Sequence, residues 1–411
     1  MQPRLQDTLV VIGGGAAGIF CAVNAARRRP SLRVIVLEKS TRLLSKVKIS
    51  GGGRCNVTHA CDDPAAMSRC YPRGGAFVRK AFHRFFTTDT IDWFEARGVR
   101  LKTEPDGRMF PVTDRSQTII DCLLREAERY DVGIRTRCEV TALERSAEGF
   151  TVRLATGETI PARFVCVAVG GYSRAAAFDW LRSLGHRIEE PVPSLFTFNL
   201  TPEDRIPLPG VSVPHARVRI AGMKLEAEGP VLVTHWGLSG PAVLRLSAWG
   251  ARALQEMQWQ FGVRVNWIPD HKEPDLRNYF QEQRVHSGSR QVTAHPLPEI
   301  PARLWSFLAA ASGIPDGMRW ADVPATAFNR FIKLLTDWEG QVSGKTTFKE
   351  EFVTAGGIAL TDVDPQTMQS KQVAGLYFAG EVLDVDGITG GYNFQHAWTS
   401  GWIAAAAITS A

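Results

Sequence analysis

Apolar runs alternate with helical spacings over the first 40 residues. A short apolar run ends at Ile12, residues 16–29 follow with mostly small and apolar side chains, and residues 32–37 form a second apolar run. Continuous apolar runs of this length are typical of strands that are buried on both faces of a parallel sheet. The pattern predicts strand, helix and strand over residues 8–38, which is how an α/β domain begins.

Two further segments have helical periodicity. Residues 77–97 place Phe82, Phe85, Phe86, Ile91 and Phe94 on one apolar face, which predicts a helix. Apolar residues recur at the same intervals over residues 116–130, which predicts a second helix.

Short strands follow these helices. Residues 134–143, 150–154 and 159–161, with a turn near Gly157, predict a small antiparallel set. Residues 164–169 form a continuous apolar run that ends in Gly170-Gly171, which predicts another buried parallel strand leading into a tight turn.

The pattern changes near residue 190, where prolines become frequent. Alternating segments such as 216–220 and 231–234 and a strand at 263–268 predict a small β-barrel-like unit, and 271–337 is charged and mostly helical. The α/β pattern returns at residues 376–381 and in an Ala-rich helix over 394–408. We therefore expect an α/β protein in which a discontinuous Rossmann-like domain, residues 1–190 and 350–411, is interrupted by a β-barrel-like insert, 191–270, and a helical insert, 271–349.

The first glycine turn has the flanks of a dinucleotide-binding fingerprint. Gly13, Gly15 and Gly18 follow the first apolar run, and Glu38 ends the second, twenty residues after the last glycine. In this arrangement the glycines permit a sharp turn and a close approach to a pyrophosphate, while the carboxylate reaches a ribose hydroxyl. We expect an adenine dinucleotide here.

Two more glycine turns, at 170–171 and 380–391, suggest that this dinucleotide is a flavin. A flavin dinucleotide is long and touches several strand ends, and the positive end of the last helix would stabilise negative charge on the reduced ring. We expect Glu381 to meet the ribityl chain or a group near the phosphates.

Composition limits the other possibilities. No run approaches the roughly 20 apolar residues that span a bilayer, and the first strand begins too early to leave room for a signal peptide. Seven cysteines, an odd number, all lie in the first 170 residues, which favours a reducing compartment. The spacing of Cys61, Cys70 and His59 fits no standard zinc site, so we expect no metal. These features predict a cytoplasmic protein.

Positive charge is concentrated near the N-terminus. The formal net charge is +6, and residues 1–110 carry 19 Lys and Arg against 9 Asp and Glu. Within residues 46–84 eight basic residues stand against Asp62 and Asp63. Tyr71, Phe77 and Phe82 lie among them, and Phe85 and Phe86 follow directly. Such a stretch can hold a phosphate backbone and stack bases, or it can be a solvated basic surface over an aromatic core.

Several long motifs resemble one flavoprotein family. They are residues 49–58 (ISGGGRCNVT), 107–111 (GRMFP), 234–241 (THWGLSGP), 354–357 (TAGG) and 375–393. Together they resemble the BaiN/YhiN family across the whole chain, which implies FAD bound noncovalently by a Rossmann-like domain with barrel and helical inserts. Transferred position by position, the resemblance implies FAD contacts at Gly13, Gly15, Ala16, Ala17, Gly18, Glu38, Lys39, Ser50, Gly51, Gly52, Arg54, Asn56, Val140, Gly170, Gly380, Glu381, Gly391, Tyr392, Asn393 and Phe394. His396 and Trp398 stand where many relatives are more aliphatic, and we expect His396 to be a satisfied or surface residue.

The resemblance implies a flavin oxidoreductase but leaves the substrate open. Relatives reduce steroid-type enones, oxidise amines, or form dihydrouridine in large-subunit ribosomal RNA. Reduction of an enone or of uridine adds hydride to the carbon β to a carbonyl, and an acid protonates the α-carbon. Cys55 is the candidate acid, since Arg54 beside it would lower the pKa of the thiol, although Cys55 can equally serve only to pack under the loop. His59 and His235 are weaker candidates.

We expect reduction of uridine in ribosomal RNA, with the basic stretch 46–84 as the RNA contact. The alternatives are a small-molecule enone or amine as substrate, and a flavin-bound module that senses redox state or binds a partner without turnover. No second dinucleotide fingerprint follows residue 18. We therefore expect NADPH or NADH to bind transiently and to reduce the flavin directly.

Overall fold

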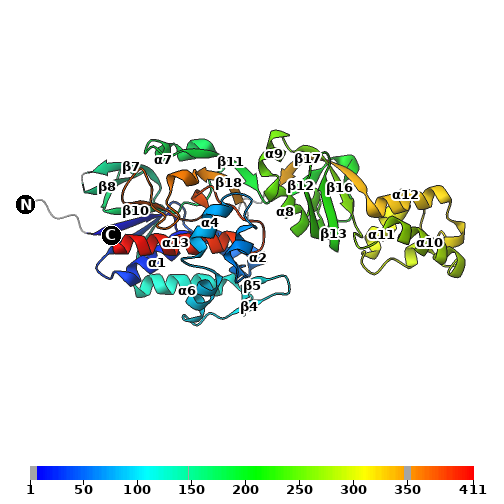
Figure 1. The fold of residues 1–411 in the computed structure, drawn as a ribbon, viewed down its shortest axis with the longest axis horizontal. Coiled ribbons are helices and arrows are strands. Elements are labelled where there is room, and N and C mark those ends of the chain that lie inside the picture. The colour runs from blue at the N-terminus through cyan, green and yellow to red at the C-terminus, as the bar shows by residue number, and fades with distance from the viewer. Residues whose placement is uncertain (1–6, 147, 347–352) are drawn as a thin grey trace, which may run out of the picture. The chain divides into compact units, whose positions relative to one another are not determined.

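The computed structural model describes residues 7–146, 148–346 and 353–411, and its contacts divide the chain into two compact units (Figure 1). Unit 1 comprises Met1–Ser194 and Phe348–Ala411, and unit 2 comprises Leu195–Thr347. The chain leaves unit 1 after strand β11 (Ile188–Ser194) and re-enters it before β18 (Val353–Ile358). These two strands pair in antiparallel fashion, so the two chain segments of unit 1 are joined by a sheet.

Unit 1 is built on a five-stranded parallel sheet. The strand order is β19 (Leu376–Phe378), β10 (Phe164–Val167), β1 (Thr8–Ile12), β2 (Arg33–Glu38) and β6 (Gly133–Thr136). The predicted strand, helix and strand over residues 8–38 are confirmed as β1, α1 (Ala16–Arg28) and β2.

The prediction for residues 134–143 is wrong in one respect. We expected one antiparallel strand, but residues 134–136 belong to the parallel sheet as part of β6, next to β2. The backbone enters the left-handed region at Arg137 (φ 57°), which breaks the run. The antiparallel sheet begins only afterwards, as β7 (Val140–Ser146), β8 (Gly149–Leu154) and β9 (Thr159–Ala162), and it packs against β1 and β10.

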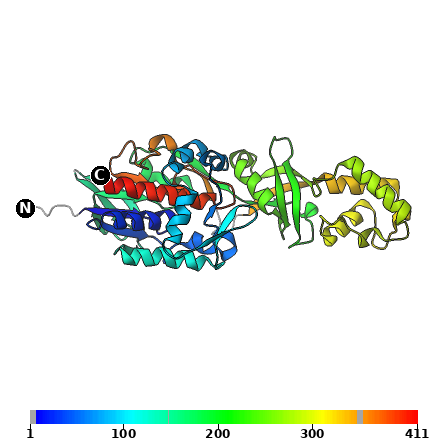
Figure 2. The ribbon, with the colours of Figure 1, turned by 60° about the horizontal axis from the view of Figure 1, so that its bottom comes forward.

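Three long helices accompany the parallel sheet. In Figures 1 and 2, α1 lies between α13 (Tyr392–Ser410) and α6 (Ser116–Arg129). Helices α1 and α13 pack closely at Gly401, which has no Cβ atom. A Cβ atom there would stand 2.7 Å from the carbonyl oxygen of Ala17. The predicted helices over 116–130 and 394–408 are therefore confirmed.

The predicted helix over 77–97 is two helices. Helix α4 (Gly75–Phe82) ends before His83, and α5 (Thr87–Glu95) begins after Phe86. The carboxylate of Asp89 accepts a hydrogen bond from the backbone N–H of Phe86 at 2.7 Å, and this cap starts the second helix. Apolar spacing alone does not show such a break, since both helices bury their aromatic residues in the same core.

The remaining elements of unit 1 are short. They are α2 (Ser45–Gly53), β3 (Thr58–His59), α3 (Pro64–Ser68), β4 (Leu101–Thr103), β5 (Arg108–Pro111) and α7 (Asp179–Arg182). Strands β3, β5 and β4 form a three-stranded antiparallel sheet.

Unit 2 combines a closed six-stranded barrel with helices. The barrel order is β12 (Thr197–Leu200), β15 (Gly237–Ser239), β14 (Glu226–Val233), β13 (Ser212–Ile220), β16 (Gln260–Asn266) and β17 (Trp338–Thr346). The helices are α8 (Pro241–Trp249), α9 (Ala251–Glu256), α10 (Glu273–His286), α11 (Ala302–Ser312) and α12 (Ala325–Thr336).

Strand β17 closes the barrel, although it lies within residues 271–349, which we expected to form the helical insert. It pairs with β16 and with β12, across long stretches of chain that no local pattern connects. The barrel and the helices share one hydrophobic core in which Trp267, Trp305 and Trp320 are fully buried. Among the helices that the structure describes, none combines the length and the apolar character needed to cross a membrane.

Candidate cofactor and active site

The first glycine turn joins β1 to α1 with no room for side chains. Gly13 has φ 113°, and a Cβ atom there would stand 2.3 Å from the carbonyl oxygen of Ala168. A Cβ atom at Gly18 would stand 2.0 Å from the carbonyl oxygen of Gly13. The turn is therefore compact, and α1 packs directly onto it.

The N-terminus of α1 is open where a pyrophosphate would be held. Its N-cap, Gly15, offers no side chain to the free backbone N–H groups, and the first turn contains no acidic residue. A Cβ atom at Gly15 would meet no atom within 4 Å. Unpaired N–H groups at a helix N-terminus bind phosphate, so Gly15, Ala16 and Ala17 fit the phosphates of a dinucleotide.

Glu38 stands at the end of β2, beside this turn. Its carboxylate accepts hydrogen bonds from the backbone N–H of Gly14 at 2.9 Å and of Ser40 at 2.8 Å. Each carboxylate oxygen keeps a further lone pair for a ribose hydroxyl. Lys39 follows, with its ammonium group 5.6 Å from the ring centre of Tyr172. Val140 opens β7 just after Cys138, whose N–H bonds to the Glu38 carbonyl.

A second cluster joins the loop after α2 to the glycine turn before α13. The backbone of α2 departs from helical dihedrals at Ser50, Gly51 and Gly52. With its amide suitably oriented, the Asn56 side chain donates to the carbonyl of Thr58 and accepts from the N–H of Gly391 at 3.0 Å. The two glycine-rich segments that the sequence predicted to touch FAD thus contact each other.

Glycine is required at position 391 of this cluster. Its φ is 95°, and a Cβ atom there would stand 2.5 Å from the Thr58 carbonyl. Helix α13 begins at the next residue, Tyr392, with no side-chain cap. The amide of Asn393 bonds in both directions with the backbone of Gly387 and so fixes the approach to this turn. Phe394 is part of the same first turn and stacks on Trp398.

Glu381 links three segments near the third glycine turn. Its carboxylate pairs with Lys46 of α2 at 2.6 Å and accepts a hydrogen bond from the backbone N–H of Thr354 at 2.9 Å. The Thr354 hydroxyl oxygen is buried and has no hydrogen-bond partner among the residues that the structure describes. Gly170 has open space at its Cβ position. A buried hydroxyl without a partner beside an open glycine turn fits a polar ligand such as the cofactor.

Cys55 is fully buried, and its backbone lies in the left-handed region (φ 62°). Burial raises the pKa of its thiol to about 12. The expectation that Arg54 lowers this pKa is wrong, because the Arg54 guanidinium pairs with Glu104 at 2.5 Å and lies over the ring of Phe110. The thiol is therefore protonated at neutral pH and is not a nucleophilic thiolate.

Three further side chains predicted near the flavin are held by backbone groups. The His396 ring is buried and donates from Nε2 to the Gly380 carbonyl at 3.2 Å, while burial lowers its pKa to about 4. Trp398 donates to the Val57 carbonyl at 2.9 Å. His59 stacks on the Tyr392 ring at 4.8 Å and bonds through Nδ1 to a carbonyl of the 390–391 turn.

Sequence reasoning missed a buried ion pair. Asp386 has no exposed surface, forms a two-point ion pair with Arg73 and accepts a hydrogen bond from the Ser194 hydroxyl at 2.8 Å. Burial raises the pKa of Asp386, and Arg73 opposes this shift. An isolated Asp and an isolated Arg 313 residues apart give no local signal of such a pair.

The aromatic residues of the basic stretch do not stack bases. Tyr71, Phe77, Phe82, Phe85 and Phe86 are at most 7% exposed and pack in the core of unit 1. The alternative, an aromatic core beneath a basic surface, is the one that the fold adopts. Over the described part of the chain, no three His, Cys, Asp or Glu side chains are arranged to hold a metal ion.

Comparison with known proteins places these observations in a family. The chain matches the model of the HI0933-like protein Rossmann domain over residues 7–407. It is 33% identical to an Escherichia coli protein named ribosomal RNA dihydrouridine synthase over 407 residues, 96% of each chain. It is 30% identical to a Haemophilus influenzae protein of the same name, covering 97% of this chain and 98% of the relative. A Clostridium scindens protein named 3-dehydro-bile acid delta(4,6)-reductase is also 30% identical, over 96% and 97%.

Two solved structures share the fold at low sequence identity. They are a 3-ketosteroid-delta4-(5alpha)-dehydrogenase from Rhodococcus jostii (TM-score 0.52, 13% identity, 98% of each chain) and a 3-ketosteroid delta1-dehydrogenase from Sterolibacterium denitrificans (TM-score 0.53, 11% identity, 98% and 100%). The whole-length match to the family model and to its curated relatives agrees with the glycine turns described above. The chain belongs to the HI0933-like family of Rossmann-domain proteins and is an FAD-dependent oxidoreductase.

Proposed function

We propose that this oxidoreductase uses NADPH or NADH to reduce a conjugated C=C bond, and that its substrate is uridine in large-subunit ribosomal RNA. The observation that carries the proposal is the similarity, over nearly the whole of both chains, to two proteins named ribosomal RNA dihydrouridine synthase. A substrate of this kind would place the protein in the cytoplasm.

The residues that would hold FAD lie in the three glycine turns of unit 1. The N–H groups after Gly15 would bind the pyrophosphate, Glu38 would bind a ribose, and the turn at Gly391 would lie against the ring system. When bound and reduced, FAD supplies a hydride to an electron-poor carbon. The N-terminus of α13 carries partial positive charge, so it would stabilise negative charge on a group bound against it.

Cys55 is the proposed proton donor, with a purely structural role as the alternative. Its left-handed backbone beside the glycine-rich loop supports a functional role, since strained residues cluster at active sites. Its burial and raised pKa favour the structural role, because efficient acids have a pKa near the working pH. If Cys55 is the donor, Cys55→Ala slows turnover about 10²- to 10⁴-fold without changing FAD content.

No second dinucleotide fingerprint is available for a resident nicotinamide, so we propose that NADPH or NADH binds transiently and reduces the flavin directly. The test is anaerobic titration of the FAD-loaded protein with each nucleotide while the flavin absorbance is followed. Bleaching by either one supports the proposal. A flavin that neither nucleotide bleaches would contradict this part of it.

The substrate is tested in the second half of the same experiment. Large-subunit ribosomal RNA lacking the modification is added to the anaerobically reduced protein, and reoxidation of the flavin is measured together with dihydrouridine in the RNA. A small-molecule enone is the second candidate, because the bile acid reductase is as similar as one of the RNA enzymes. Reoxidation by steroid-type enones but not by RNA would select this candidate, and reoxidation by neither would favour a module without turnover.

A further inference from the structure

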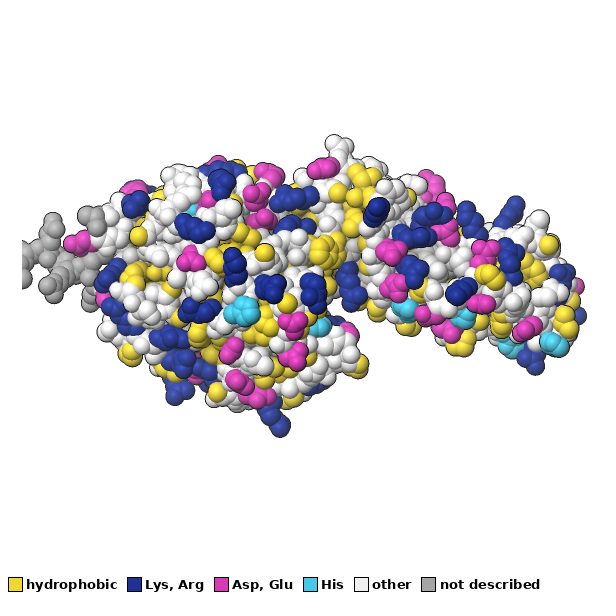
Figure 3. Space-filling model, viewed as in Figure 1, with side chains coloured by type: hydrophobic (Ala, Val, Ile, Leu, Met, Phe, Trp, Pro, Cys, Tyr) yellow, Lys and Arg dark blue, Asp and Glu magenta, His cyan; other side chains and the backbone are white. Residues whose placement is uncertain are grey.

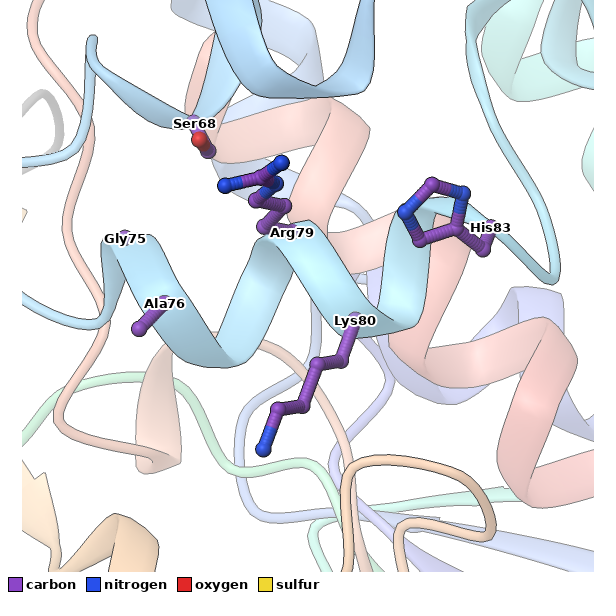
Figure 4. Close-up of a pocket in the computed structure, with 6 residues that line it drawn as sticks. All are labelled: Ser68, Gly75, Ala76, Arg79, Lys80 and His83. Carbon is purple, nitrogen blue, oxygen red and sulfur yellow. The ribbon is translucent and has the colours of Figure 1, made fainter.

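Helix α4 has a buried apolar face and an exposed cationic one. Phe77, Val78, Ala81 and Phe82 are buried in the core of unit 1. Arg79, Lys80, His83 and Arg84 are exposed. Figure 4 shows Arg79, Lys80 and His83 projecting from the helix, with Arg79 extending toward Ser68 of α3. In Figure 3, Lys and Arg side chains and a His gather over the part of unit 1 where α4 lies in Figure 1.

Among the residues that the structure describes, no carboxylate pairs with the cations of this face. Some exposed arginines of unit 1 are paired with carboxylates, as Arg135 is with Glu158 and Arg153 with Glu144. Within the described residues, Arg79, Lys80 and Arg84 form no ion pair with a carboxylate. One carboxylate on each side of this segment is used by a helix cap: Asp63 accepts from the N–H groups of Ala65 and Ala66, and Asp89 from that of Phe86.

The positive charge continues onto the end of α1. Burial lowers the pKa of Arg28, and repulsion from Arg27 and from Arg84 lowers it further. The Arg28 guanidinium lies 4.6 Å from the ring centre of Trp402, which stacks on Phe85, the residue after Arg84. Packing thus holds like charges near one another at a cost that a bound polyanion would offset.

The face also has a hollow and a position near the proposed flavin site. A hollow of about 520 Å³ is lined by Ser68, Gly75, Ala76, Arg79, Lys80 and His83. The N-cap of α4 is Gly74, where a Cβ atom would stand 2.6 Å from the Val385 side chain. The N–H of Ile388 donates to the Cys70 carbonyl. The cationic residues therefore start beside the loop that leads to the 390–391 turn.

We propose that the sugar–phosphate backbone of the RNA substrate binds Arg79, Lys80, His83, Arg84, Arg27 and Arg28, which we call the α4 cationic face. This inference rests on the proposed function and narrows the contact from the whole stretch 46–84 to one surface. Several unpaired cations in a row suit a chain of phosphates, and the burial of the neighbouring aromatic residues means that this surface reads charge and not bases.

The test measures RNA affinity against salt concentration for the FAD-loaded protein. The triple variant Arg79→Gln/Lys80→Gln/Arg84→Gln removes three phosphate contacts. Each contact contributes about 0.7 to 0.9 to the slope of log K against log salt, so the slope becomes shallower by about 2 to 3. Dihydrouridine formation in the same RNA falls at subsaturating RNA concentration and recovers at saturation.

A matched control removes the same charge elsewhere. Arg135, Arg153 and Arg163 are partly exposed and are paired with Glu158, Glu144 and Asp7. Their triple replacement by Gln leaves the salt slope within about 0.5 of wild type, because these cations hold no phosphate. Flavin absorbance and thermal unfolding show that both triple variants are folded.

The outcomes separate this inference from the proposed function. If the wild type forms dihydrouridine and the α4 triple variant keeps its salt slope, the surface is wrong and the function stands. If the wild type binds RNA no better than the control polyanion heparin and forms no dihydrouridine, the proposed surface and the proposed function are both wrong. If the face binds vesicles of anionic lipid and not RNA, the RNA assignment is overturned.

Discussion

Replacing Gly15 with alanine separates cofactor binding from folding. In the protein without FAD, the added Cβ meets no atom within 4 Å, and the backbone at Gly15 (φ −86°, ψ −169°) is allowed for alanine. Loss of a glycine N-cap costs about 0.5 to 1 kcal/mol, and the reduced entropy of the unfolded chain returns about 0.4 to 1 kcal/mol. We therefore expect the apoprotein to unfold within about 0.5 kcal/mol of wild type.

FAD affinity responds differently, because the open space at Gly15 is where we place the pyrophosphate. The methyl group would push the phosphates away from the N–H groups of α1. Losing one hydrogen bond to a charged group costs about 1.5 to 3 kcal/mol, which raises the Kd about ten- to hundredfold. Apoprotein stability is measured by urea unfolding, and FAD affinity by fluorescence titration of the apoprotein.

Gly18→Ala is the contrasting variant. Its Cβ would stand 2.0 Å from the Gly13 carbonyl oxygen, so the apoprotein itself loses about 1 to 3 kcal/mol from overpacking. If Gly15→Ala binds FAD as tightly as wild type, the phosphates do not lie at this helix terminus. If it destabilises the apoprotein as much as Gly18→Ala does, the space around residue 15 is filled in the apoprotein and cannot be where the pyrophosphate binds.

Three other predictions follow from buried groups. Asp386→Asn removes the counter-charge of Arg73, whose side chain is 14% exposed. The free energy of unfolding measured in urea should fall by about 3 to 5 kcal/mol. A fall of less than about 1 kcal/mol would mean that the pair is solvated. The pKa of His396 is about 4 in the folded protein and 6.5 in the unfolded chain, so the unfolded state takes up a proton first as the pH falls from 6.5 to 4. The free energy of unfolding should therefore drop by about 3 kcal/mol over this range. His396→Gln should abolish this part of the pH dependence, and an unchanged dependence of unfolding free energy on pH would show that His396 is not its source. With its pKa near 12 and no exposed surface, Cys55 should resist iodoacetamide at pH 8 while the partly exposed cysteines react, as peptide mass spectrometry would show; equally fast labelling would contradict its burial.

The spacing of residues along the chain predicted those features that depend only on neighbouring residues. The turn at Gly13, Gly15 and Gly18 and the carboxylate of Glu38 were predictable because backbone geometry and strand length fix their spacing. The break between α4 and α5 was not, because the cap at Asp89 interrupts a segment whose apolar spacing runs on without a change.

Contacts between distant segments could not be predicted from one sequence. Strand β17 completes a barrel begun some 140 residues earlier, and Asp386 meets Arg73 only because the loop before α13 folds onto the start of α4. The alternation of basic and aromatic residues over 46–84 was ambiguous, because burial decides whether a ring lies in the core or on the surface. The fold buries the rings and leaves the cations of α4 exposed.

Nucleoside mass spectrometry of large-subunit RNA from cells with and without the gene tests the proposed formation of dihydrouridine by this flavoprotein. We expect dihydrouridine to be lost on deletion and to be restored by the wild-type gene but not by Gly15→Ala at low flavin supply. If Cys55 donates the proton, Cys55→Ala also fails to restore it, whereas restoration by Cys55→Ala assigns that residue to packing. An unchanged dihydrouridine content after deletion would contradict the proposed RNA substrate and favour a small enone.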